Sequence, residues 1–175
     1  MKNFINQIQP WIDEEESEQL LRVVRSTFVT EHDLTEEFEE KIKELTGTKH
    51  AIAMANGTVA LFCCLRSLGI GPGDEVIVPD MTFIATANSV ILAGATPIFC
   101  DVNLDDLSLN TKKVKECITN NTKAIMPVHL YGGSANIKEL ERICKEFDLF
   151  LVEDAAQGVG VKYDGKHVGT FGHLG

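Results

Sequence analysis

Two patterns of apolar residues alternate along the chain. Apolar positions three or four residues apart predict helices, and this pattern covers residues 13–25, 34–45, 56–68, 82–93, 114–118 and 137–147. Short apolar runs, several rich in valine and isoleucine, predict strands, and they cover residues 50–55, 75–78, 96–100, 123–130 and 149–153. Strands joined through helices need long crossovers, which are typical of parallel sheets. The sequence therefore predicts a three-layer α/β/α fold with a mostly parallel sheet.

The last part of the chain follows a different pattern. Residues 159–163 and 167–171 flank Asp164-Gly165-Lys166, which predicts a β-hairpin with an Asp-Gly turn. The sequence then ends at Gly175 without a helix or a polar tail to cover the last strand. Its 175 residues suffice for one domain or a large part of one. We therefore expect the chain to be part of a larger unit.

Charge and composition narrow the range of functions. The chain has 16 Lys and Arg residues against 26 Asp and Glu residues, a formal net charge of −10, which disfavours binding to nucleic acids and anionic membranes. Its 5 cysteines have neither zinc-site nor C-x-x-C spacing, so they predict free thiols, a reducing cytoplasm and no metal site. The first residues contain no apolar signal core, and no apolar stretch is long enough for a membrane span.

Suggestive residues follow four of the predicted strands, and ligands of open α/β sheets bind at such carboxyl ends. Asn56-Gly57-Thr58 follows strand 50–55 and begins a helix, where N–H groups and the positive helix end suit a phosphate. The alternative is that Asn56 simply caps the helix. Phe83 follows strand 75–78 and either stacks on a flat ligand ring or belongs to the core.

The other two strand ends also allow two interpretations each. His129-Leu130-Tyr131-Gly132 ends strand 123–130. The polar groups of the His129 and Tyr131 side chains either line a pocket or hydrogen-bond to the backbone of a turn. Glu153-Asp154-Ala155-Ala156-Gln157 ends strand 149–153. One interpretation makes Asp154 a helix N-cap and Gln157 its capping-box partner. That interpretation accounts for two residues, but it does not explain why such ends recur on four strands.

Taken together, the four ends fit a phosphorylated heteroaromatic ligand such as pyridoxal phosphate. A carboxylate opposite the ring nitrogen, here Asp154, keeps the pyridine protonated so that it accepts electrons from the substrate. Gln157 can hydrogen-bond the ring hydroxyl, while the small Ala156 lets the ring lie flat on the strand end and Phe83 packs on its other face. The hypothesis from the residues is therefore a cofactor site at the carboxyl edge of the sheet.

Seven blocks of the sequence stand in an order that resembles a known family. They are NGTVAL at 56–61, GDEVIVP at 73–79, TFIATAN at 82–88, GATP at 94–97, VHLYG at 128–132, EDAAQ at 153–157 and VGTFG at 168–172. The chain resembles the DegT/DnrJ/EryC1/StrS sugar aminotransferases, which have the aspartate-aminotransferase fold (PLP fold type I). The resemblance covers nearly the whole chain and implies that residues 1–175 are an N-terminal arm plus most of the pyridoxal phosphate-binding large domain.

The resemblance also implies an activity. It is the transfer of an amino group from glutamate to a nucleotide-linked 4-keto-6-deoxy sugar for polysaccharide biosynthesis, with pyridoxal phosphate as cofactor, in a cytoplasmic homodimer with shared active sites. By this resemblance Gly57 and Thr58 bind the cofactor phosphate, Phe83 the ring face, Asp154 the ring nitrogen and Gln157 the ring oxygen.

The resemblance further implies a Schiff-base lysine shortly after residues 168–172 and a C-terminal small domain, both expected beyond Gly175. Lys162 and Lys166 are poor substitutes, because such a lysine needs a desolvated site and Lys166 follows an exposed turn. Residues 1–175 alone are therefore expected to be inactive. Two alternatives stay open: a dehydratase-like or non-catalytic relative that binds pyridoxal phosphate, and an α/β interaction domain without a cofactor.

Overall fold

The computed structural model describes residue 6 and residues 9–175, so residues 1–5 and 7–8 of the expected N-terminal arm lie outside the described residues. The elements follow one another in an order close to the predicted one. They are α1 (Glu14–Ser26), α2 (Asp33–Thr46), α3 (Gly57–Ser67), β1 (Glu75–Pro79), α4 (Ala85–Leu92), β2 (Thr96–Cys100), α5 (Thr111–Cys117), β3 (Thr122–Ile125), the 3-10 helix η1 (Leu130–Gly132), α6 (Ile137–Phe147), β4 (Phe150–Leu151), β5 (Lys162–Tyr163) and β6 (Lys166–His167).

A four-stranded sheet forms the centre of the body. Its strand order is β2-β1-β3-β4, and every neighbouring pair is parallel. Isolated parallel bridges continue the pairing, from Val128 to Asp154 and from Val152 to Leu174. The separate pair β5 and β6 is antiparallel around Asp164 and Gly165, as the Asp-Gly turn predicts. The expectation of a mostly parallel sheet is confirmed.

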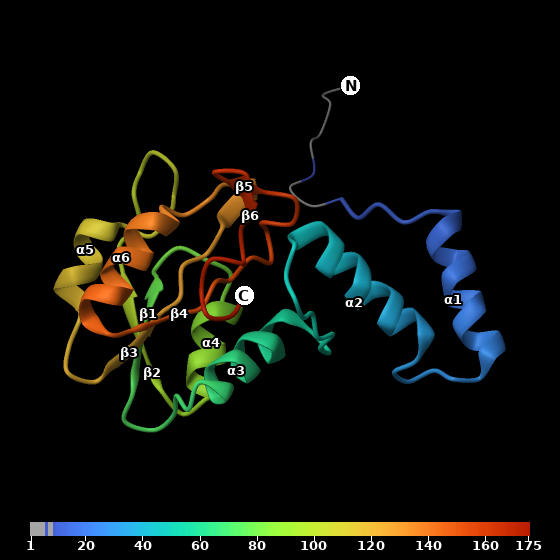
Figure 1. Ribbon diagram of the computed structural model, residues 1–175, viewed down its shortest axis with the longest axis horizontal. Coiled ribbons are helices and arrows are strands. Elements are labelled where there is room, and N and C mark those ends of the chain that lie inside the picture. Colours follow the sequence, from blue (N-terminus) through green and yellow to red (C-terminus); the bar gives the residue numbers. More distant parts are fainter. Residues whose placement is uncertain (1–5, 7–8) are drawn as a thin grey trace.

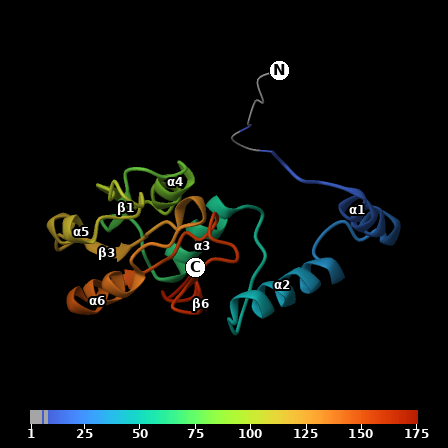
Figure 2. The same cartoon turned by 90° about the horizontal axis from the view of Figure 1, so that it is seen from above.

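Helices cover both faces of the sheet because successive side chains of a strand point to opposite faces. On β1, Val76 and Val78 belong to an apolar cluster with α3 and α4, whereas Ile77 belongs to a second cluster with α5 and α6. All three side chains are fully buried. Figure 2 shows α4 and α6 on opposite sides of β1 and β3. The three-layer α/β/α architecture is therefore confirmed.

The first two helices form an arm, of which α1 stands apart from this body while α2 contacts it at β6 (Figure 1). Asp13 caps α1 by accepting a hydrogen bond from the Glu15 N–H, and the Glu16 side chain completes a capping box. Neither α1 nor α2 contains a buried residue. Arg22 of α1 donates two hydrogen bonds to the Glu37 carboxylate of α2, at 2.7 and 3.2 Å. The arm is thus built from well-formed helices with almost no core of its own.

One predicted strand does not form among the described residues. Residues 50–55 carry no strand pairing, and the Ala53 N–H donates instead to the Glu39 side chain of α2 at 2.7 Å. An apolar run becomes a strand only beside a partner strand, and none lies next to this segment in the described part of the chain. The strand prediction for residues 50–55 is therefore wrong for the structure as it stands.

Several predicted boundaries also move. The helix predicted from Thr82 begins at Ala85, and the helix predicted from Val114 begins at Thr111, because Asn110 caps it with hydrogen bonds from two N–H groups. The strand predicted over 123–130 is regular only to Ile125 and ends in η1. The strand predicted over 149–153 is regular at Phe150 and Leu151, and the bridges at Val152 and Asp154 continue it.

Candidate cofactor site

A pocket of about 260 Å³ lies at the carboxyl ends of β1, β3 and β4, beside the start of α3. The residues that line it are Asn56, Gly57, Thr58, Leu61, Thr82, Phe83, Ala85, Val128, Asp154, Ala156 and Gln157. All five residues predicted to hold a cofactor, Gly57, Thr58, Phe83, Asp154 and Gln157, are among them. Residues up to 101 positions apart in sequence therefore meet in one pocket, where ligands of α/β sheets bind.

The start of α3 presents N–H groups to this pocket. The Asn56 side chain accepts a hydrogen bond from the Val59 N–H at 3.0 Å, so Asn56 does cap the helix. That cap leaves the N–H groups of Gly57 and Thr58 without an acceptor inside the helix. Apart from its chain neighbours and the backbone of its own helix, no atom of the described structure lies within 4 Å of where a Gly57 side chain would begin. Cap and anion site are therefore compatible, and the open space at Gly57 suits an approaching anion.

Phe83 is not part of the core. Its side chain is 69% exposed, although it follows the buried strand β1 and lines the pocket. Exposure of an apolar ring to water is unfavourable, and a flat ligand stacked on the ring would remove that surface from water. The alternative that Phe83 is a core residue is wrong.

Asp154 lies at the pocket floor and is 7% exposed. Its Oδ2 atom accepts a hydrogen bond from the Thr86 hydroxyl at 2.7 Å, and Oδ1 accepts a longer one from the Ala156 N–H at 3.3 Å. The residues that follow form turns rather than a helix. Gln157 accepts a hydrogen bond from the Tyr131 N–H at 3.0 Å and none from an N-terminal helix turn. The capping-box interpretation of Asp154 and Gln157 is therefore wrong.

Glu153, next to Asp154, has a different surrounding that the sequence did not reveal. It is fully buried and accepts hydrogen bonds from the N–H groups of Gly169, Phe171 and Gly172 at 2.6–2.9 Å. It also accepts one from the His129 ring at 2.9 Å. Burial by itself raises the pKa of Glu153, whereas the hydrogen bonds from His129 and from backbone N–H groups lower it, and the net effect is a lowered pKa.

His129 serves this network rather than the pocket. It is fully buried, and its Nδ1 atom accepts a hydrogen bond from the Ala135 N–H at 3.2 Å. Nε2 must then carry the ring hydrogen that Glu153 accepts. Of the two interpretations of residues 129–132, the one in which His129 satisfies a turn is confirmed. Tyr131 is 67% exposed and has a left-handed backbone with φ of 52°, but it is not a lining residue of the pocket.

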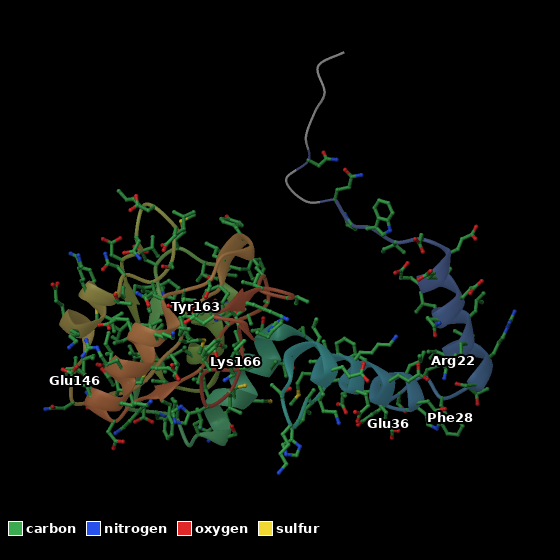
Figure 3. The ribbon with its side chains drawn as sticks, turned by 45° about the horizontal axis from the view of Figure 1, so that its top comes forward. Arg22, Phe28, Glu36, Glu146, Tyr163 and Lys166 are labelled. Atoms are coloured by element: carbon green, nitrogen blue, oxygen red, sulfur yellow. The ribbon has the colours of Figure 1, made fainter. Side chains whose placement is uncertain are left out.

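Lysine is missing from the pocket lining throughout the described part of the chain. Lys166 on β6 lies on the side of the body that contacts α2 (Figure 3). Its Nζ atom donates to the Thr170 carbonyl and lies 4.5 Å from the centre of the Phe171 ring. Lys162 is exposed on β5. Neither lysine is placed to act on a ligand of the pocket.

Within residues 6 and 9–175, no cluster of three or more His, Cys, Asp and Glu residues is suited to hold a metal ion. The same residues include no helix with the length and apolar character that a membrane crossing requires.

Two named relatives are similar to this chain in sequence. The chain is 40% identical over 172 residues to GDP-perosamine synthase of Escherichia coli O157:H7, covering 98% of this chain and 47% of the relative. It is 43% identical over 164 residues to GDP-perosamine synthase of Caulobacter vibrioides, covering 93% of this chain and 44% of the relative. The chain thus spans just under half the length of these relatives.

Solved structures give the same picture. An aminotransferase from Psychrobacter cryohalolentis superposes with a TM-score of 0.89 at 37% identity, covering 94% of this chain and 42% of that one. NtdA of Bacillus subtilis, solved with bound cofactor PMP, superposes with a TM-score of 0.83 at 34% identity, covering 97% and 41%. The family model of the DegT/DnrJ/EryC1/StrS aminotransferases matches residues 10–175. The chain belongs to the DegT/DnrJ/EryC1/StrS aminotransferase family.

Proposed function

We propose that the chain forms the N-terminal arm and most of the cofactor-binding large domain of a pyridoxal phosphate-dependent sugar aminotransferase. The observation that carries the proposal is the convergence of Gly57, Thr58, Phe83, Asp154 and Gln157 on one pocket. Family membership and the PMP bound to NtdA support it. The Schiff-base lysine and a small domain then belong to residues beyond Gly175, which agrees with the absence of lysine from the described lining of the pocket.

The residues present fit the phosphate and the ring of this cofactor. The phosphate group suits the start of α3, where N–H groups of Gly57 and Thr58, the Thr58 hydroxyl and the positive helix end favour an anion. The exposed ring of Phe83 suits one face of the pyridine. The small side chain of Ala156, also at the pocket lining, leaves space for a flat ligand. These groups bind and orient the cofactor.

Two polar side chains then set the chemistry. When bound, pyridoxal phosphate accepts the electrons that a substrate carbon releases on losing its proton. Asp154 holds a proton on the ring nitrogen, because a buried negative charge favours a positive partner close to it. Gln157 binds the ring oxygen through its amide, which the Tyr131 N–H orients. The mostly buried position of Asp154 keeps water from competing for its carboxylate.

The proposed substrates are glutamate as amino donor and a nucleotide-linked 4-keto-6-deoxy sugar as acceptor. The similarity to two GDP-perosamine synthases supports an amino-sugar product. The test is an assay of the complete enzyme with glutamate and several nucleotide-linked keto-sugars. Amination of a 4-keto-6-deoxy hexose is expected. Exchange restricted to free amino acids and keto acids would contradict the sugar specificity.

We further propose a cytoplasmic homodimer with shared active sites. The free state of all five cysteines supports a reducing compartment. The exposed apolar side chains of the arm, Leu20, Val24, Phe28 and Phe38 among them, support a second copy as cover for this surface. Sedimentation velocity of the complete protein is expected to show a dimer. A monomer at all concentrations up to those in the assay would contradict this part of the proposal.

The cofactor proposal is tested by binding of pyridoxal phosphate to residues 1–175, measured by equilibrium dialysis. We expect saturable binding at one site, about tenfold weaker in Asp154→Asn, since a hydrogen bond to a charged group contributes about 1.5–3 kcal/mol. Asp105→Asn, which removes an exposed acid from the loop after β2, is the matched control and should bind like the wild type. Borohydride should not fix the cofactor to one specific lysine of this chain. Equal binding by Asp154→Asn would contradict the site.

A further inference from the structure

Thr86 is a buried hydroxyl that points at Asp154 from another element. It lies in the first turn of α4 and is fully buried. Its Oγ1 atom donates to Asp154 Oδ2 at 2.7 Å, although the two residues are 68 positions apart in sequence. This distance is short, in the range of hydroxyl-to-carboxylate hydrogen bonds, which are stronger than those between neutral groups. Asp154 is therefore held from the side of α4 as well as by its own strand end.

A second hydroxyl extends this contact. Thr82 Oγ1 lies 3.0 Å from Thr86 Oγ1. The single hydroxyl hydrogen of Thr86 is used in the bond to Asp154, so Thr82 must be the donor to Thr86. The two threonines thus form a directed chain of hydrogen bonds that ends on the carboxylate. Thr82 lines the pocket, whereas Thr86 does not and can act on a ligand only through Asp154.

The two oxygens of Asp154 are left in unequal states. Oδ2 has the short bond from Thr86, while Oδ1 has only the bond of 3.3 Å from the Ala156 N–H among the described residues. A bond of that length is at the weak end for N–H donors. Oδ1 consequently retains the capacity to accept a hydrogen bond from a ligand. Loss of the Thr86 hydroxyl would free Oδ2 and allow the carboxylate to rotate about its side-chain torsions.

We propose that Thr86 is a positioning residue for the cofactor ring, which fixes the Asp154 carboxylate so that one oxygen meets the N–H of a protonated pyridine. The inference rests on the proposed function, because the ring is that of pyridoxal phosphate. Its consequence is specific. Thr86 contributes to binding through the ring nitrogen alone and leaves the contacts of the phosphate and the ring faces unchanged.

The experiment compares two probes on the same folded chain. They are pyridoxal phosphate and its carbocyclic analogue, in which C–H replaces the ring nitrogen. The dissociation constant of each is measured by equilibrium dialysis for the wild type and for Thr86→Val, which removes the hydroxyl at nearly constant volume. Thr86→Ser keeps the hydroxyl. Thr122→Val is the matched control, because Thr122 is also buried and hydrogen-bonded, but at the amino end of β3.

We expect the wild type to bind pyridoxal phosphate about tenfold more tightly than the analogue, a ratio that corresponds to about 1.4 kcal/mol. In Thr86→Val this preference should fall to about twofold or less, while Thr86→Ser and Thr122→Val keep it. Because the preference is a ratio, partial unfolding of a variant does not change it. An unchanged preference in Thr86→Val overturns the inference, whether the two affinities stay the same or fall by an equal factor. Failure of the wild type to bind either probe overturns the proposed function as well.

Discussion

Helices α6 and α1 begin with the same kind of cap, but their apolar faces differ in burial. Each starts at a side-chain cap, Asn136 for α6 and Asp13 for α1, and each has apolar residues at helical spacing. In α6 this face is buried against the sheet, with Ile137, Leu140 and Ile143 fully covered. In α1 no residue is buried. Capping and periodicity therefore specify a helix, but only burial ties the helix to the fold.

The largest expected effect follows from the buried side of this comparison. Leu140→Ala empties space in the cluster between α6 and the sheet, and we expect it to lower the free energy of unfolding by about 3 kcal/mol. Leu20→Ala in α1 is the matched control for the monomeric chain of residues 1–175, because Leu20 is 66% exposed when no second copy covers it. It should change the free energy of unfolding by less than about 0.5 kcal/mol. Urea denaturation followed by circular dichroism measures both, and similar losses would refute the contrast between body and arm.

A smaller effect is expected at the buried carboxylate of Glu153. Glu153→Gln keeps the shape of the side chain but replaces one accepting oxygen by an NH₂ group that faces N–H donors. We therefore expect it to lower the free energy of unfolding by about 2 kcal/mol.

The same variant should change the pH dependence. Since the pKa of Glu153 is lowered in the folded chain, its contribution is present above the usual glutamate pKa of about 4.3 and is lost as the pH falls through the folded value. The wild type should therefore lose more stability than Glu153→Gln on acidification below about pH 4.3. Urea midpoints at a series of pH values measure this difference, and parallel curves for the two proteins would contradict the charged state of Glu153.

Helix caps give the next contrast. Asn56→Ala removes the cap of α3, which packs on the sheet, and should lower the free energy of unfolding of the body by about 1 kcal/mol. Asp13→Ala removes the cap of α1 and should reduce helix content without shifting the main transition. Differential scanning calorimetry separates the two outcomes. A shift of the main transition by Asp13→Ala would show that the arm unfolds together with the body.

The smallest effect is expected at the ion pair inside the arm. Arg22→Ala removes both hydrogen bonds to Glu37, and both side chains are about half exposed. Exposed ion pairs contribute little because water screens them. We expect faster amide hydrogen exchange in α1 and no change in the main unfolding transition. Unchanged exchange in α1 would show that the pair does not hold the two arm helices together.

The sequence predicted most of the body because local patterns determine it. Val76, Ile77 and Val78 form a continuous apolar run, which predicts a strand buried on both faces. The predicted ends of strands 75–78 and 149–153, together with the predicted helix start at Asn56, supplied most of the pocket lining, because parallel strands bring their carboxyl ends to one edge. Residues 129–132, the other predicted strand end, do not line it. Residues 50–55 misled the prediction, since an apolar run does not show whether a partner strand lies beside it.

What the sequence could not show is which face each polar side chain uses. Thr86 lies within the block TFIATAN at residues 82–88, but nothing in that pattern connects it with Asp154, so its bond to Asp154 appears only in the structure. His129 was equally compatible with a pocket and with a turn until its bond to Glu153 was visible. A signal for Glu153 did exist. Neighbouring strand residues point in opposite directions, so of two adjacent carboxylates only one can face the pocket.

This pairing of Glu153 with Asp154 has a consequence for directed evolution. One strand end holds a carboxylate that secures the loop at residues 169–172 and, one position later, a carboxylate that faces a ligand. A saturation library at position 154 should therefore yield mostly folded protein with altered ligand preference. A library at position 153 should yield mostly insoluble protein. New chemistry is accordingly accessible at this edge of the sheet by single substitutions that leave the scaffold intact.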